Sequence, residues 1–108
     1  MNHYATYFDR GYLAQGVALW RSLARHDPEA ELTVLALDDE AAAVLGAIGG
    51  ARLRVLPLGE LLAAEPALAA AQAERTRSEF IFALMPCLVR HLFSTRPEVG
   101  RWMYLDAD

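Results

Sequence analysis

Two aspartates, Asp106 and Asp108, follow an apolar strand-like segment and are separated by a single residue. Side chains alternate along an extended chain, so both carboxylates are expected to project toward the same side where the strand ends. Two carboxylates so close together repel each other, and a divalent cation removes that repulsion. Hard oxygen ligands at a strand end suit Mg²⁺ or Mn²⁺, ions that can hold a diphosphate. Acidic residues also terminate strands without binding metal, so the rest of the chain has to decide between these interpretations.

Composition narrows the class of protein. The chain has 108 residues and is 55% hydrophobic, which is enough for the core of one small domain. The net charge is −4, and the ten basic side chains are all arginines scattered along the sequence, which argues against a nucleic-acid partner. The single cysteine, Cys87, cannot form an internal disulfide, and its apolar surroundings favour a buried structural thiol over a nucleophile.

Membrane and export signals are not expected. The N-terminus enters strand-like sequence without a charged segment and apolar run, so no signal peptide is predicted and the cytoplasm is the default compartment. The longest apolar stretch, Phe80 to Val89, contains Pro86 and is too short to span a bilayer.

Hydrophobic patterning predicts alternating strands and helices. The expected strands are Asn2 to Phe8, Leu32 to Leu37, Leu53 to Leu58 and Arg101 to Leu105. The expected helices are Tyr12 to Arg25, a segment from Asp38 to Gly49, Gly59 to Glu74 with a break at Pro66, and a segment that begins at Thr76. This order is typical of an α/β fold with a Rossmann-like parallel sheet wound with helices, here a single domain over residues 1–108.

The last of these helices carries the clearest local signals. Thr76 and Glu79 fit a capping box, so a helix should begin there. Pro86 lies about ten residues inside it and is expected to kink or divide the helix. Two rows of side chains are expected to be buried, namely Phe80, Leu84, Leu88 and Leu92 in one and Ile81, Met85 and Val89 in the other.

Acidic residues gather where the expected strands end. In parallel sheets, ligands bind outside the carboxyl ends of the strands, near the point where strand order reverses. The residues at these ends are Asp9, Asp38, Asp39, Asp106 and Asp108. Asp38 and Asp39 are more readily explained as caps of the helix that follows them.

Three segments together resemble a known family. Thr6-Tyr7-Phe8-Asp9, with Gly11-Tyr12-Leu13 and the helix from Gly16 to Leu23, is similar to the start of GT-A glycosyltransferases, above all bacterial enzymes akin to family 8. The segment Arg75 to Phe80, with Pro86 after it, resembles the "RS-x-E-[YF]" region of the same group. The closing Tyr104 to Asp108 resembles its DxD strand.

The resemblance implies a donor site for a nucleotide-diphosphate sugar, with uridine diphosphate as the expected nucleotide. Asp106 and Asp108 would hold Mn²⁺ or Mg²⁺ on the diphosphate, and Asp106 would also lie near the ribose or sugar. The first strand and turn, Thr6, Tyr7, Phe8 and Asp9, would receive the base, with Tyr7 or Phe8 stacking on it. Alternation places one of these two aromatic side chains in the core instead. Arg77 would approach the diphosphate from a helix start, or else it is a solvated cation or a partner of Glu79.

The resemblance also has gaps. Many related enzymes have an arginine in the helix before the DxD strand, where this chain has Leu84-Met85-Pro86. The acceptor-binding half that follows the DxD strand in the family is not in this sequence, so we expect a donor-binding half without turnover, assign no catalytic base and leave the acceptor open. The last strand would then form an exposed sheet edge through which the chain could self-associate.

Three other interpretations stay open. A sugar nucleotidyltransferase has a similar sheet but usually carries a basic Gly-rich loop after the first strand, where this chain has Asp9-Arg10-Gly11. A receiver-like or flavodoxin-like module would use acidic strand ends for metal without a nucleotide sugar. A non-catalytic remnant would pack against another chain through its sheet edge.

Overall fold

The strands form one parallel sheet, as the sequence predicts. The computed structural model describes residues 1–107. The strands are β1 (His3–Phe8), β2 (Glu31–Ala36), β3 (Leu53–Pro57) and β4 (Met103–Tyr104). Their order is β3-β2-β1-β4, and every neighbouring pair is parallel. The α/β, Rossmann-like fold class is therefore confirmed.

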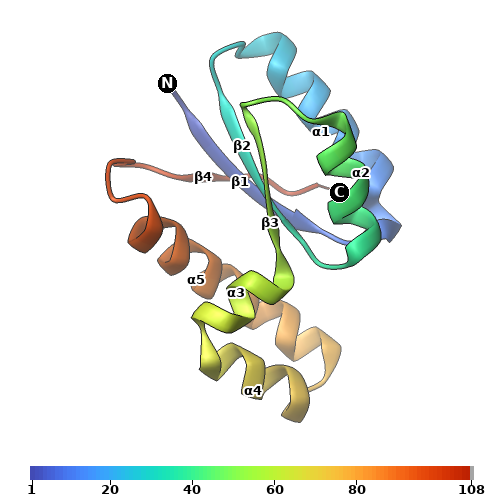
Figure 1. Ribbon diagram of the computed structural model, residues 1–108, viewed down its shortest axis with the longest axis vertical. Coiled ribbons are helices and arrows are strands. Elements are labelled where there is room, and N and C mark those ends of the chain that lie inside the picture. Colours follow the sequence, from blue (N-terminus) through green and yellow to red (C-terminus); the bar gives the residue numbers. More distant parts are fainter. Residues whose placement is uncertain (108) are drawn as a thin grey trace. The chain divides into compact units, whose positions relative to one another are not determined.

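The helices between the first three strands cover one face of this sheet. A short 3-10 helix, η1 (Arg10–Tyr12), leads into α1 (Leu13–His26), and α2 (Asp39–Ile48) follows β2. Phe8, Val34 and Leu45 belong to the buried core that β1, β2 and β3 share with α2, and side chains of α1 pack against it. Figure 1 shows α1 and α2 on the same side of the sheet. All six residues of β2 are buried, as expected of a central parallel strand.

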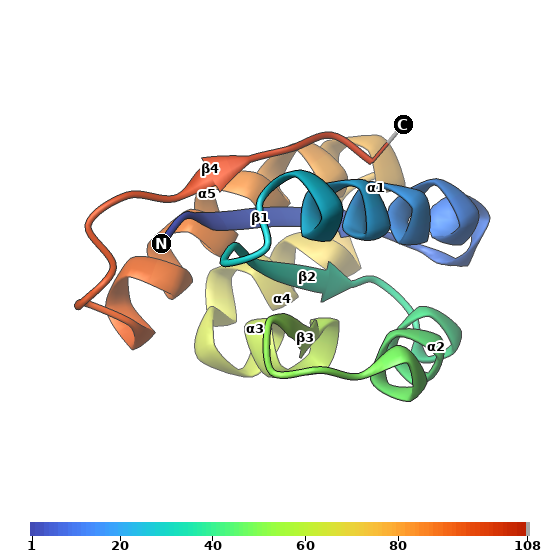
Figure 2. The same ribbon diagram turned by 90° about the horizontal axis from the view of Figure 1, so that it is seen from above.

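Strand lengths differ from the expectation at the two edges of the sheet. Pro57 ends β3, which is an edge strand, as a residue without an amide donor requires. The fourth strand was expected over Arg101 to Leu105, but only Met103 and Tyr104 pair with β1. The amide of Leu105 still donates to the carbonyl of Ala5 at 3.0 Å, so the extended segment after β4 continues beside β1 (Figure 2).

The chain divides into two units. Unit 1 consists of residues 1–58 and 101–108, and unit 2 consists of residues 59–100. In sequence, unit 2 is an insertion between β3 and β4. The prediction of a single nucleotide-sugar-binding domain over residues 1–108 stays a prediction.

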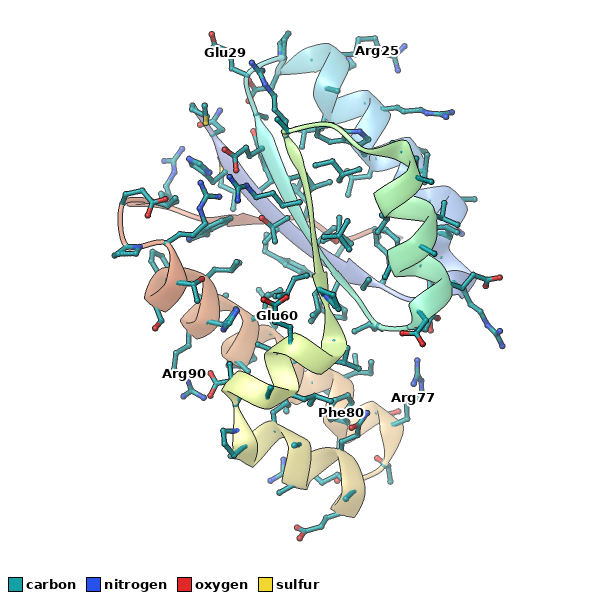
Figure 3. The ribbon with its side chains drawn as sticks, in the orientation of Figure 1. Arg25, Glu29, Glu60, Arg77, Phe80 and Arg90 are labelled. Atoms are coloured by element: carbon teal, nitrogen blue, oxygen red, sulfur yellow. The ribbon has the colours of Figure 1, made fainter. Side chains whose placement is uncertain are left out.

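Unit 2 is helical, with α3 (Leu58–Ala64) at its start, α4 (Pro66–Glu74) and α5 (Arg77–Thr95). The expected break at Pro66 is confirmed, because proline fits the first turn of a helix but not its interior. Thr76 caps α5, with its Oγ1 accepting from the amide of Glu79 at 3.2 Å. Arg77 lies in the first turn of α5 and Arg90 further along the same helix (Figure 3).

Two expectations for α5 need correction. Pro86 does not divide the helix, which runs through it as one element of 19 residues, and the alternative of a kink at Pro86 stays a prediction. A proline removes only one helical hydrogen bond, and the buried Leu84 and Leu88 on either side of it hold the helix by packing. Of the two rows, only that of Phe80, Leu84, Leu88 and Leu92 is buried, while Met85 in the other row is 37% exposed.

None of the helices in the described part of the chain is both long enough and apolar enough to cross a membrane.

A two-pronged ion pair joins α5 to the residue that precedes α4. Arg90 donates from Nε to Oε1 of Glu65 at 2.8 Å and from a second nitrogen to Oε2 at 3.0 Å. These hydrogen bonds lower the pKa of Glu65 below its ordinary value and raise that of Arg90. A carboxylate held in this way is stabilised in its charged form.

This ion pair predicts an acid-sensitive contact in unit 2. Because the pKa of Glu65 is lower in the folded chain, its stabilisation is complete above the ordinary value of 4.5 and is lost as pH falls through the lower folded value. Glu65→Gln should therefore reduce stability at neutral pH and bring variant and wild type closer together in acid. Urea unfolding from about pH 6 down to about pH 3 measures this difference. Glu60→Gln, which removes an exposed carboxylate of α3, is the control, and an equal acid response in both variants would contradict the prediction.

Candidate functional site

The sheet reverses its order between β1 and β4. From β1 the chain builds β2 and β3 on one side, and β4 then adds on the other side of β1. Ligands of wound α/β sheets bind at such a switch point, outside the carboxyl ends of the strands. The residues that follow β1 and β4 therefore define the candidate site.

At the end of β1, the structure separates the two aromatic candidates. Phe8 is 3% exposed and packs in the core with Ala36 and Leu45. Its ring lies against Gly16 of α1. Tyr7 is half-buried and projects from the opposite face, where its ring centroid lies 5.8 Å from that of Tyr104. Of the two, Phe8 is the core member that alternation requires, and Tyr7 lies outside the core, so the predicted stacking on a base falls to Tyr7 and stays a prediction.

Thr6 also belongs to the interior. It pairs in register with Val34, is 0% exposed, and its hydroxyl has no hydrogen-bond partner among residues 1–107. A role of Thr6 in nucleotide binding stays a prediction, and the observed environment of its side chain is that of a core residue.

The turns after β1 and β2 are tied together by aspartates. Asp9 caps η1 and accepts from the amide of Gly11 at 2.9 Å. Asp38 caps α2 through Oδ1, which accepts from the amide of Ala41 at 2.8 Å, while its Oδ2 accepts from the amide of Arg10 at 2.9 Å. The expectation that Asp38 is a helix cap is confirmed. Its second bond crosses between the two turns and fixes the loop beside Tyr7 and Asp9.

At the end of β4, Tyr104 and Asp106 lie on the same side as Tyr7. Ala5 pairs with Tyr104, and alternation brings Asp106 to the same face two residues later. Ala107 packs against the core on the other face. Burial is the main cause that raises the pKa of Tyr104, and the neighbouring Tyr7 and Asp106 raise it further. The Asp106 side chain is exposed, so its carboxylate is open to a ligand.

The remaining predicted residues are not part of this cluster as described. Asp108 lies outside the described residues. Arg77 is an exposed residue of α5 in unit 2, and its approach to a diphosphate stays a prediction. Over residues 1–107, no group of three or more His, Cys, Asp or Glu side chains is arranged to hold a metal ion.

Comparisons with known proteins add one relative. The chain is similar to "Uncharacterized protein YfnF" of Bacillus subtilis (strain 168), with 28% identity over 105 residues. The match covers 97% of this chain and 34% of the relative, so the chain spans about a third of that protein's length. No protein-family model matches the chain, and no solved structure matches it. The name of this relative states no activity.

Tyr104 is the site residue that sequence reasoning missed. It was considered only as part of the strand that carries the aspartates. The signal was nevertheless present, because a residue two positions before Asp106 on an extended segment shares its face. The position of Tyr7 on that face adds a second hydroxyl-bearing ring from the neighbouring strand.

Proposed function

We propose that this chain forms the donor-nucleotide part of a metal-dependent glycosyltransferase of the GT-A type. Such an enzyme transfers a sugar from a nucleotide-diphosphate sugar, here a UDP-sugar, to an acceptor. The observation that carries the proposal is the meeting of Tyr7, Tyr104 and Asp106 at the reversal of strand order between β1 and β4. The order of the three motifs along the sequence supports it independently.

In this proposal each residue has a distinct task. Tyr7 offers its ring to the uracil, and the Asp9 turn, fixed by the bonds of Arg10 and Gly11 to aspartate side chains, provides polar groups for the edge of the base. Asp106, together with Asp108, provides hard oxygen ligands of the kind that Mn²⁺ and Mg²⁺ prefer. When bound, the cation supplies Lewis-acid neutralisation of the charge on the departing nucleoside diphosphate. Arg77 is proposed as a further contact of the diphosphate.

The strand order bears on one of the competing interpretations. A flavodoxin-like or receiver-like module has the strand order 2-1-3-4-5, whereas this sheet has the order β3-β2-β1-β4. The strand order therefore argues against that interpretation.

Cys87 is a free thiol in the structure, in keeping with the cytoplasmic location that we include in the proposal. Self-association through the outer edge of β4 is a further proposal, because β4 ends the sheet on that side.

The test is an amide NMR titration of the chain with Mn²⁺, with and without uridine diphosphate. Paramagnetic broadening is expected at Asp106, and it should increase with nucleotide and extend to Tyr7 and Asp9. Asp106→Asn should weaken the metal-dependent binding about tenfold or more, because losing a contact to a charged group costs about 1.5–3 kcal/mol. Chelation of the metal should have the same effect on the wild type.

Asp39→Asn is the matched control, since it removes an exposed carboxylate in the first turn of α2. Binding by this variant should equal that of the wild type. A well-dispersed spectrum in which Mn²⁺ and nucleotide leave Asp106 and Tyr7 unchanged would reject the proposed donor site.

A further inference from the structure

The two carboxylate oxygens of Asp38 hold two different segments. Oδ1 accepts from the amide of Ala41 at 2.8 Å, which caps α2, and Oδ2 accepts from the amide of Arg10 at 2.9 Å. A helix cap needs a single side-chain oxygen, so serine, threonine or asparagine would serve α2 equally well. The bond to Arg10 therefore goes beyond what the helix requires, and it reaches the turn that follows β1.

Two other amides of that turn are bonded within the turn itself. The amide of Gly11 donates to Oδ1 of Asp9 at 2.9 Å, and the amide of Tyr12 donates to the carbonyl of Asp9 at 3.1 Å. These bonds determine the shape of the turn. The amide of Arg10 is held from another segment, by Asp38, and this bond determines where the turn lies relative to α2.

The sheet joins the two segments only up to the point where both turns begin. The register of β1 and β2 ends with the pair of Phe8 and Ala36, and the amide of Leu37 then donates to the carbonyl of Phe8 at 3.1 Å. The bond from Arg10 to Asp38 extends this connection past the last pair of strand residues. Hydrogen bonds to an ionised carboxylate are roughly twice as strong as those between neutral groups.

We propose that Asp38 is a positioning residue that fixes the Asp9 turn against the start of α2, so that the polar groups of this turn meet a nucleotide base in one arrangement. The consequence for the base rests on the proposed function, whereas the fixing of the turn is a property of the chain without ligand. A turn that is ordered in advance loses less conformational freedom when a ligand binds. One carboxylate thus couples the beginning of α2 to the candidate site.

The test separates the two bonds of Asp38 by substitution. Asp38→Ser retains one oxygen close to the main chain and should still cap α2, but it has no second oxygen for the amide of Arg10. Asp38→Asn is the second variant, because the nitrogen of its side-chain amide can only donate and one of the two bonds must be lost. Asp38→Ala removes both bonds. Asp39→Asn, which removes the neighbouring exposed carboxylate, is the matched control.

Amide hydrogen exchange in the chain without metal or nucleotide is measured at Arg10 and Ala41. In Asp38→Ser we expect exchange at Arg10 to become about tenfold faster, while exchange at Ala41 stays as in the wild type. Both amides should exchange faster in Asp38→Ala and neither in Asp39→Asn. Thermal unfolding of each variant shows whether the fold is retained.

The second measurement is the affinity for uridine diphosphate in the presence of Mn²⁺, which we expect to fall about tenfold in Asp38→Ser and to stay unchanged in Asp39→Asn. Unchanged exchange at Arg10 in both Asp38→Ser and Asp38→Asn would overturn the positioning role. So would exchange at Arg10 that rises only together with exchange at Ala41, because loss of the helix start would then be the cause.

The two proposals fail in different ways. Faster exchange at Arg10 with unchanged nucleotide affinity would overturn the importance of Asp38 for binding. Faster exchange at Arg10 in a chain whose wild type binds neither Mn²⁺ nor uridine diphosphate would support the role of Asp38 in fixing the turn and reject the proposed function.

Discussion

Phe8→Ala is expected to cost unit 1 about 3–5 kcal/mol of unfolding free energy, because truncation of a buried aromatic side chain leaves a cavity. Phe8 is 3% exposed and lies in the core between the sheet and the helices of unit 1. A loss of this size is a large part of the total stability of a small domain. Urea unfolding followed by fluorescence measures it, because Trp20 and Trp102 both belong to unit 1.

The neighbouring substitution, Tyr7→Ala, is the matched comparison and should behave in the opposite way. Its side chain is half-buried on the other face, so stability should fall much less, while metal-dependent binding of uridine diphosphate should weaken through loss of the stacking surface. Stacking of one base on an aromatic ring contributes about 1–3 kcal/mol. If Phe8→Ala remained as stable as the wild type and lost nucleotide affinity instead, the assignment of the two rings would have to be exchanged.

Gly16→Ala should be the second large effect, because α1 approaches Phe8 so closely that there is no room for a methyl group. Gly16 is buried, and an added Cβ would overlap the Cε2 and Cζ atoms of the Phe8 ring. Either the ring or the helix has to move, and overpacking of this kind costs about 1–3 kcal/mol. The same urea experiment measures the loss.

Gly46→Ala provides the control within a second helix of the same unit. A Cβ at Gly46 in α2 has nothing within 4 Å, so the substitution only replaces glycine with a better helix former. It should raise stability by up to about 1 kcal/mol. Equal losses at both glycines would mean that helix geometry, and not contact with Phe8, determines the effect at Gly16.

Local sequence patterns predicted the individual strands and helices well. Nearly continuous apolar residues indicated β2, a glycine pair indicated the end of α2, and Pro66 indicated a new helix, because each of these signals acts through the backbone of its own segment. The caps at Thr76 and Asp38 were predicted for the same reason.

Features that depend on contacts between distant segments could not be predicted in the same way. Alternation established that Tyr7 and Phe8 lie on opposite faces, but only the packing of α1 against Phe8 decides which ring is buried. The continuation of α5 through Pro86 likewise depends on tertiary packing that outweighs a local penalty. The bond from the Arg10 amide to Asp38 joins turns that are 28 residues apart. No signal within either turn contains that information.

The position of unit 2 between β3 and β4 sets the order in which the candidate site is completed during synthesis. The ribosome releases β1, β2 and β3 first, and these strands can pair while the helical insertion is still being made. Tyr104 and Asp106 emerge after it, and they reach Tyr7 only by closing a loop that contains nearly the whole chain. The entropic cost of closing a loop grows slowly with the number of residues in it, so the helical insertion adds little to the free energy of closure. A nascent chain that stops before β4 therefore retains most of its folded sheet and yet lacks the proposed cation ligand.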